Sequence, residues 1–341
     1  MSYIIGFSSH FSCIFILKMA EILILFFQSL TAHVTMNKIP CALPRVDWRP
    51  SLMQEKSDSR SFTAVWLCLF LFSGLFAVLQ AFILPPLHLP QGVMFMLCSC
   101  LAASPILCYG SRTGVWRLYP VTGTQRPPVR VFLYLFSIIL ILNLLLSLCT
   151  PAIEHALRLV GIGLREVTIN TASSLSLTLY VCIVAPIVEE LIYRGVILRK
   201  LLPYGTHLAI VLPAVCFALM HHNFYQGLSA VLGGLVYGFV ALRYSLAASI
   251  CLHIAKNIIS TVLPLLEKSG ELGAWATLLL FFIAGVFVLI GSIIVIRRKS
   301  FRLPQSVSFP NQPRAILSHP ALWLVLLFDT AMLIVLSFTH V

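Results

Sequence analysis

Val129–Leu148 reads VRVFLYLFSIILILNLLLSL, a run of twenty residues whose one charged side chain, Arg130, stands next to its start. A helix needs about 20 mostly apolar residues to cross the hydrocarbon core of a bilayer, and charges inside that core are costly. The run therefore predicts a transmembrane helix. The whole chain has this character, because 59% of its 341 residues are hydrophobic and only 10% are charged, against roughly 25% charged residues in a soluble domain.

Eight more apolar runs follow the same pattern and are separated by glycine, proline and charged residues. The sequence therefore predicts an all-α, polytopic transmembrane helix bundle of about nine spans, of which the fifth is the shortest. Residues 62–341 are predicted to form one membrane-embedded domain, and residues 1–61 an N-terminal extension that is either a poor extra span or the product of an early start codon. The nine runs are Phe62–Leu84, Gly92–Tyr109, Val129–Leu148, Ala172–Tyr193, His207–His222, Gln226–Tyr244, Leu246–Leu266, Gly273–Ile296 and Leu317–Phe338.

The net charge of +12 comes mainly from Lys and Arg in the loops between the runs. In a soluble protein this charge would suggest nucleic acid, but in a membrane protein basic loops set the orientation and contact anionic headgroups. With the chain before Phe62 in the cytoplasm, the far side receives only Arg158, Arg165 and Lys268 among the loop cations. The distribution predicts no nucleic-acid partner and a cytoplasmic loop after Tyr193.

Only three acidic residues lie within the nine runs, namely Glu189, Glu190 and Asp329. The first two belong to the stretch APIVEELIYRG at residues 185–195. Arg194 follows Glu190 by four residues, so the two share a helix face and can pair. Glu189 then lies about 100° round the helix and is free to face a cavity. A salt bridge that anchors a helix end would explain this motif equally well.

Two further motifs place polar side chains on apolar helices. Phe217 and His221 are four residues apart, as are His253 and Asn257, so each pair shares a helix face. Polar side chains inside a span need partners or water. The plain interpretations are an interfacial position for a lone histidine, which suits His222, and helix–helix hydrogen bonding, which suits Asn257.

Together the three motifs supply a carboxylate, two imidazoles and an amide, which is a set that can activate water. Glu189, with His221, could take a proton from water, while His253 and Asn257 could stabilise the oxyanion formed at a carbonyl. Alternatively Glu189, His221 and His253 could bind zinc and leave its fourth position for water. The residue types leave both the metal-free and the zinc scheme open.

The order Glu-Glu-x-x-x-Arg, Phe-x-x-x-His, His-x-x-x-Asn on successive apolar helices resembles the CAAX-protease and bacteriocin-processing family of intramembrane peptidases, also called the Abi family. The match covers about Ala185 to Asn257. The resemblance implies a core of about eight helices around a cavity open to the cytoplasm and the lipid. It also implies Glu189 as general base, His221, His253 and Asn257 as oxyanion donors, and Glu190 and Arg194 as supporting residues.

We therefore predict an intramembrane endopeptidase that hydrolyses a membrane-associated peptide or protein, in a bacterial inner membrane with its active site on the cytoplasmic side. A proton- or ion-coupled transporter using Glu189, Glu190 and Asp329 is the alternative from another class, and a catalytically idle scaffold or immunity factor is a third. A serine mechanism has two features in its favour, Gly227-Leu-Ser229-Ala and His253 on the following helix, but the first lacks the final glycine of the rhomboid motif. The sequence leaves the oligomeric state open.

Two features fit this prediction less well. Lys256 lies three residues after His253 and would bring a cation to the site, where it could pair with Glu190. On straight spans with the predicted ends, Glu189 and His221 would differ in depth by on the order of 10 Å. We therefore expect the Glu189 helix to run past Arg194, to tilt or to sit deeper. Asp329 is expected to pair with Lys256 or another buried cation as a structural lock.

Overall fold

The computed structural model describes residues 55–115, 126–165, 174–298 and 312–340. The predicted N-terminal extension therefore lies outside the described residues except at its end. The helices of the described part are α3 (Glu55–Val78), α4 (Gln91–Arg112), α6 (Val129–Leu159), α7 (Leu175–Leu179), α8 (Ala185–Glu190), α9 (Leu198–Leu201), α10 (Thr206–Leu219), α11 (Phe224–Arg243), α12 (Leu246–Lys268), α13 (Glu271–Arg298), α14 (Gln312–Leu317) and α15 (Pro320–Ser337).

Short helical segments of other pitch extend several of these helices. The π-helical segments are η1 (Leu79–Ile83), η4 (Tyr180–Val184) and η5 (Leu191–Ile197), and the 3-10 segments are η2 (Pro85–Leu87) and η6 (Leu202–Tyr204). The elements from α7 to η6 follow one another without a break, so Leu175–Tyr204 is one helical rod of 30 residues.

Eight helical runs in the described part are long and apolar enough to cross a membrane, and the shorter apolar helix α10 is the ninth. The predicted polytopic helix bundle is therefore confirmed, and the chain is a multi-pass integral membrane protein. Three predicted boundaries were wrong by several residues. The third span continues past Leu148 to Leu159. The fourth span continues past Tyr193 to Tyr204, and the fifth ends at Leu219, so that His221 and His222 lie in the turn after the helix.

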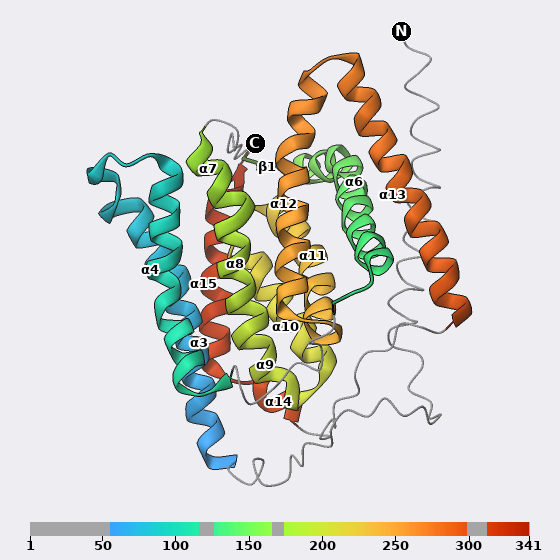
Figure 1. The fold of residues 1–341 in the computed structure, drawn as a ribbon. Coiled ribbons are helices and arrows are strands. Elements are labelled where there is room, and N and C mark those ends of the chain that lie inside the picture. The colour runs from blue at the N-terminus through green and yellow to red at the C-terminus, as the bar shows by residue number, and fades with distance from the viewer. Residues whose placement is uncertain (1–54, 116–125, 166–173, 299–311, 341) are drawn as a thin grey trace.

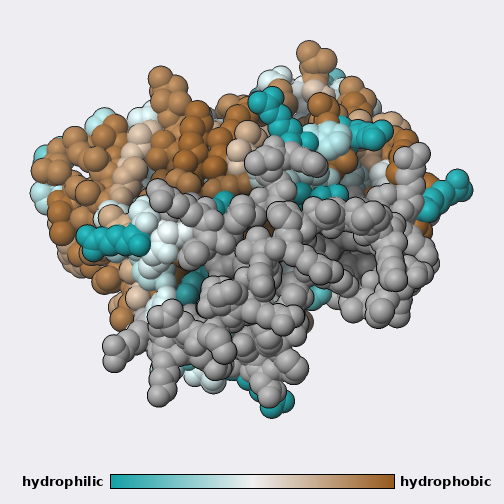
Figure 2. All heavy atoms as spheres, turned by 60° about the horizontal axis from the view of Figure 1, so that its bottom comes forward, coloured by the Kyte–Doolittle hydropathy of each residue, from teal (hydrophilic) through white to brown (hydrophobic). Residues whose placement is uncertain are grey.

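Successive helices reverse direction, and the first residues of α3 lie at the lower end of the bundle in Figure 1. The ends of α4, α11 and α13 at that level carry Arg112, Arg243 and Arg297, whereas Arg158 and Lys268 lie at the opposite end. This is the alternation that the loop charges predicted. Hydrophobic side chains cover the outer flank at the upper left of Figure 2, as expected of a surface that faces lipid.

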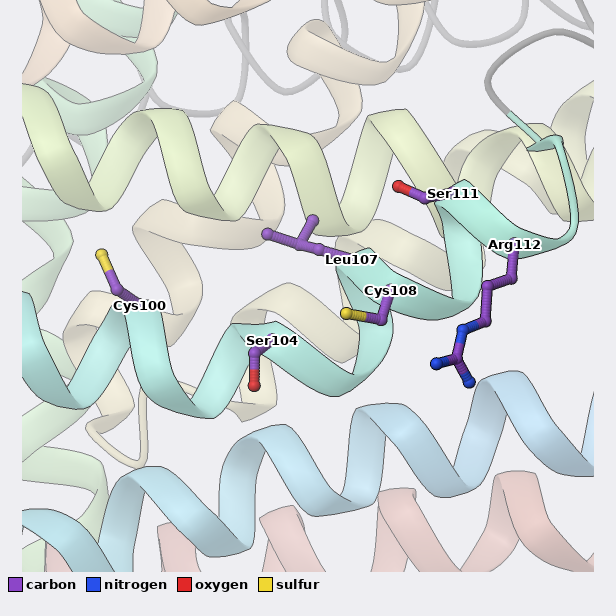
Figure 3. A pocket seen from close by; sticks show the side chains of 6 residues that line it. All are labelled: Cys100, Ser104, Leu107, Cys108, Ser111 and Arg112. Atoms are coloured by element: carbon purple, nitrogen blue, oxygen red, sulfur yellow. The ribbon is translucent and has the colours of Figure 1, made fainter.

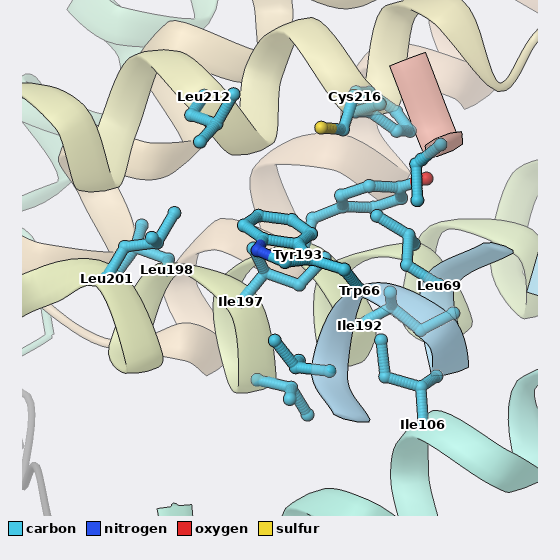
Figure 4. Close-up of a cluster of buried hydrophobic side chains, with 14 of the residues drawn as sticks. Trp66, Leu69, Ile106, Ile192, Tyr193, Ile197, Leu198, Leu201, Leu212 and Cys216 are labelled. Carbon is cyan, nitrogen blue, oxygen red and sulfur yellow. The ribbon is translucent and has the colours of Figure 1, made fainter. Parts of the chain in front are cut away.

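The largest buried cluster lies where α3, the Leu175–Tyr204 rod, α10 and α15 meet (Figure 4). Trp66, Tyr193 and Phe217 are its most deeply buried aromatic members, and each is at most 1% exposed. Because lipid is as apolar as these side chains, close packing rather than escape from water holds such helices together. The cluster fixes the rod against α10 and thereby positions the residues that the motifs singled out.

Two three-residue strands are the exception to the helical fold within the described residues. β1 (Ile162–Leu164) pairs antiparallel with β2 (Phe338–His340), with Gly163 opposite Thr339. The backbone N–H of Arg165 donates to the carbonyl oxygen of Ser337 beside this pair. The end of α15 is therefore tied to the segment that follows α6, a contact that the sequence pattern did not predict.

Gly234 of α11 lies at a close contact between helices. A β-carbon at Gly234 would lie 3.0 Å from Arg194 Nη2 and 3.0 Å from the β-carbon of Ala214. Both distances are tighter than ordinary van der Waals contact, so the lack of a side chain lets α11 pack against α10 and the rod. By contrast, a β-carbon at Gly285 of α13 would meet no atom within 4 Å.

We expect Gly234→Ala to lower the free energy of unfolding by about 1–3 kcal/mol, because the added methyl overpacks the contact between α11, α10 and Arg194. Gly285→Ala is the matched control and should leave stability unchanged or raise it slightly, since alanine favours a helix interior by up to about 1 kcal/mol. Thermal unfolding of the detergent-solubilised variants measures both. Equal behaviour of the two variants would contradict the close packing at Gly234.

Candidate active site

The turn at Gly205 brings the first two motifs to one level of the bundle. The rod Leu175–Tyr204 and α10 run antiparallel on either side of this turn (Figure 1). Glu189 is 16 residues before Gly205 and His221 is 16 residues after it. Equal numbers of helical residues on two antiparallel arms give nearly equal heights. The expected depth mismatch is therefore removed, because the Glu189 helix runs past Arg194 and α10 is short.

Glu189 and Glu190 lie in α8, between the π-helical segments η4 and η5. A π-helical turn leaves the regular hydrogen-bond ladder and often marks a functional site. Nδ2 of Asn257 in α12 donates to the carbonyl oxygen of Val181 in η4 over 2.9 Å. Asn257 therefore makes the helix–helix hydrogen bond that the plain interpretation expected, and it ties the third motif to the segment just before the glutamates.

Glu190 is fully buried and its carboxylate has partners on both oxygens. Arg194 Nη1 donates to Oε1 over 2.7 Å, and the hydroxyl of Ser249 donates to Oε2 over 2.6 Å. Arg194 Nη2 also donates to the carbonyl oxygen of Gly234 over 3.0 Å. The predicted Glu190–Arg194 pair is therefore formed, and Lys256 is not needed to neutralise Glu190.

Two aromatic rings enclose the guanidinium of Arg194. Its central carbon lies 4.9 Å from the ring centre of Phe217 and 5.4 Å from that of Tyr237. A cation over an aromatic face is stabilised by the ring quadrupole, and more strongly where water is excluded. The Phe217 position of the second motif thus has a physical role, since its ring contacts the arginine of the first motif.

His253 lies between the two glutamates. Its Nδ1 is 3.2 Å from Glu190 Oε1, and its Nε2 is 3.7 Å from Glu189 Oε2. The first distance allows a hydrogen bond and the second is too long for one. Because a carboxylate accepts, Nδ1 carries the hydrogen, and in the neutral ring Nε2 keeps a lone pair toward Glu189. The ring also stacks on Tyr237 with centres 4.5 Å apart.

His221 joins the group through Phe217. Its Nδ1 lies 2.7 Å from the carbonyl oxygen of Phe217, and its ring meets the Phe217 ring edge-on with centres 4.8 Å apart. Phe217 in turn meets the ring of His253 with centres 5.7 Å apart. The three motifs therefore converge on Phe217, and the imidazole that faces Glu189 directly is that of His253.

Sequence reasoning missed two members of the site. Ser249 precedes His253 by four residues, so Ser249, His253 and Asn257 form a polar stripe on α12 whose first residue was overlooked. Tyr237, which stacks on His253, carries no comparable signal in the sequence. Asp329 has a partner, as expected, but that partner is His222 at 2.9 Å rather than Lys256. Lys256 is half-buried and interacts electrostatically with Glu189.

Glu189, His221 and His253 are the predicted zinc ligands. Among the described residues, no three His, Cys, Asp or Glu side chains converge as a metal site would require. Both imidazoles have the ligand tautomer, with Nδ1 bound and Nε2 bearing a lone pair, but in this conformation Glu189, His221 and His253 do not fit around one ion. Metal binding here would need these side chains to move, and the zinc scheme stays a prediction.

A shallow hollow lies on the outward face of α4, away from these groups (Figure 3). Its lining residues recur every three or four positions along that helix, and most are exposed. The buried face of α4 carries other residues, such as Phe95 and Ile106. The hollow is therefore a feature of the surface that faces lipid and not part of the site. It is lined by Cys100, Ser104, Leu107, Cys108, Ser111 and Arg112.

We expect Arg194→Met to lower the free energy of unfolding by about 3–5 kcal/mol, because it leaves the buried Glu190 carboxylate without its counter-ion. Glu189→Gln should cost less than about 1 kcal/mol, since this side chain makes no hydrogen bond within the described residues. Denaturant unfolding of the two purified variants in detergent compares them. An unchanged free energy of unfolding in Arg194→Met would show that Glu190 is not held by this pair.

The segment that carries the three motifs is similar to a known protein family. Residues 171–259 match the family described as type II CAAX prenyl endopeptidase, Rce1-like. No curated protein and no solved structure matches the chain. The matched segment contains all three motifs, from the glutamates of α8 to Asn257 of α12. The resemblance to the CAAX-protease and bacteriocin-processing family of intramembrane peptidases is thereby confirmed over residues 171–259.

Proposed function

We propose that this protein is an intramembrane endopeptidase in which Glu189 activates water for attack on a peptide bond. The observation that supports this proposal most directly is the distance of 3.7 Å between Glu189 Oε2 and His253 Nε2. Both oxygens of the neighbouring Glu190 are engaged by Arg194 and Ser249. Glu189, whose side chain is 14% exposed, is therefore the carboxylate that is available for chemistry.

Glu189 Oε2 and His253 Nε2, the atoms on either side of this gap, can both accept a hydrogen bond from one water molecule. Polar atoms more than 3.5 Å apart are commonly bridged by water, and both atoms here accept hydrogen bonds. As the water oxygen attacks the carbonyl carbon, Glu189 takes one of its protons. Glu189 then gives this proton to the nitrogen of the leaving amine as the peptide bond breaks. The products are a carboxylic acid and an amine, and the glutamate returns to its starting form.

The oxyanion of the tetrahedral intermediate needs hydrogen-bond donors. Asn257 uses one N–H on Val181 and carries a second. Nε2 of His221 becomes a donor when the ring is protonated, because its Nδ1 is already committed to Phe217. Glu190 and Arg194 do not touch the reacting atoms in this scheme; they hold His253 and the rod in place.

The position of Glu189 supports a substrate that is itself held at the membrane. Glu189 lies near the middle of the 30-residue rod Leu175–Tyr204, far from either rod end. A peptide must therefore enter the bundle from lipid or from the end where the basic residues gather. A prenylated C-terminal peptide is one candidate, and a leader peptide or an anchored regulator are others. We place the protein in a bacterial inner membrane with this basic end toward the cytoplasm.

The competing mechanisms have less support from the contacts. A transporter would use its intramembrane acids as free carriers, but Glu190 is paired with Arg194 and Asp329 with His222. A serine mechanism would need a free hydroxyl near His253, but the hydroxyl of Ser229 donates to the amide oxygen of Asn143. A scaffold without activity would have no need of an available glutamate beside an imidazole.

We expect Glu189→Gln to lower the rate of peptide cleavage about 10²-fold or more, because the amide keeps the shape of the side chain but cannot take a proton. Ser229→Ala is the matched control and should cleave like the wild type. Detergent-purified protein, a diverse peptide pool and mass spectrometry give the rates and the cut sites. Cleavage that survives Glu189→Gln but falls in Ser229→Ala would contradict the glutamate mechanism and support Ser229 as the nucleophile. No cleavage by the wild type would favour the transporter or scaffold.

We expect cleavage to persist after chelation, with less than about a twofold change in rate, because the scheme relies on side-chain acid–base chemistry alone. Incubation with phenanthroline followed by desalting, with elemental analysis of the purified protein, checks this. A preparation that holds one zinc per chain and loses activity with it would contradict the metal-free scheme and support the zinc scheme.

A further inference from the structure

The last helix, α15, lies outside the segment that matches the family, yet it contacts the turn that carries His221. Asp329 of α15 is 1% exposed. Its Oδ1 lies 2.9 Å from Nε2 of His222, and the hydroxyl of Ser73 in α3 donates to its Oδ2 over 3.4 Å. The acid thus connects three elements, namely α15, α3 and the turn between α10 and α11.

A second contact from α15 holds the same turn. The hydroxyl of Ser337 donates to the carbonyl oxygen of His222 over 3.3 Å, and it accepts from the backbone N–H of Phe224 over 3.0 Å. One hydroxyl therefore satisfies backbone groups on both sides of Asn223. Irregular backbone at membrane depth is tolerated where protein groups satisfy it in this way.

The turn needs such support because its backbone is strained. His222 has a φ of +50°, in the left-handed region that residues other than glycine seldom adopt. Such a conformation persists only when the surrounding structure holds it. His221 is the preceding residue, so any relaxation of the φ angle at His222 moves the His221 imidazole relative to Phe217 and His253.

The neighbourhood of Asp329 also reaches the rod that carries Glu189. Tyr193 follows Glu189 by four residues, and its phenol lies in the neighbourhood of Asp329. In Figure 4 its phenol oxygen points toward α15. Among the described residues this buried oxygen has no hydrogen-bond partner. Asp329 therefore lies between the rod and the His221 turn, which are the two arms that must keep their relative position.

We propose that Asp329 is a positioning residue that fixes the His221 imidazole through its contact with His222, with Ser337 as a second anchor of the same turn. This inference rests on the proposed peptidase function. It assigns α15, which the sequence motifs do not include, to the support of the active site. The Asp329 side chain does not touch the reacting atoms. Its loss should therefore change the turnover step rather than substrate affinity.

The kinetic test compares variants of α15. Asp329→Leu removes the contact and should lower kcat about 10-fold with KM within about twofold of the wild type, because it misplaces a group needed only in the transition state. Asp329→Asn can still accept from His222 and should stay within about threefold. Ser337→Ala should cost about threefold in kcat because one anchor remains. Val325→Ala, which removes buried methyl groups of the same helix, is the control and should not change kcat.

Hydrogen–deuterium exchange tests, independently of activity, whether Asp329 holds the turn that carries His221. The amides of residues 220–224 should exchange about 10-fold faster in Asp329→Leu than in wild type or Val325→Ala, because the turn opens locally. Unchanged exchange and kcat in Asp329→Leu, or an equal loss of kcat in Val325→Ala, would overturn the proposal. If the wild type cleaves nothing, the proposed function fails and the role in catalysis falls with it, while the exchange rates still show whether Asp329 holds the turn.

Discussion

The structure depends on the neutralisation of one buried carboxylate, that of Glu190. A charge without a partner in an apolar bundle would cost on the order of several kcal/mol, and here Arg194, Ser249 and His253 surround it. These partners come from the rod and α12, while α11 accepts the second hydrogen bond of Arg194 at Gly234. Satisfying a single charge thus fixes the relative positions of three helices and gives His253 its orientation.

The fixed charge also separates the roles of two adjacent glutamates. Glu190 is held by its partners, and the same imidazole that contacts it turns its other nitrogen toward Glu189. Glu189 is therefore left beside a basic nitrogen at the centre of the bundle. The aromatic rings of Phe217 and Tyr237 cover the Arg194 guanidinium, which is 1% exposed, and so shield its pair with Glu190 from water.

The geometry of the second motif follows from where two helices end. The rod continues to Tyr204 and α10 stops at Leu219, so Glu189 and His221 lie at similar heights, each 16 residues from Gly205. The short helix then requires a turn inside the bundle, and α15 satisfies that turn through Asp329 and Ser337. Support for the site thus comes from a helix far away in sequence.

The sequence by itself determined the class of protein, the approximate spans, the Glu190–Arg194 pair and the three motifs, because hydropathy and helical spacing are local properties. It also placed the basic loops at one end. It did not determine that the rod passes Tyr193, since LIYRGVILRKL mixes cations with apolar residues and reads as a boundary. Only the tertiary structure decided that His253 faces Glu189, that Ser249 completes the Glu190 site and that Asp329 pairs with His222. These contacts join residues from separate helices, and their formation depends on helix packing and tilt, which no local pattern encodes.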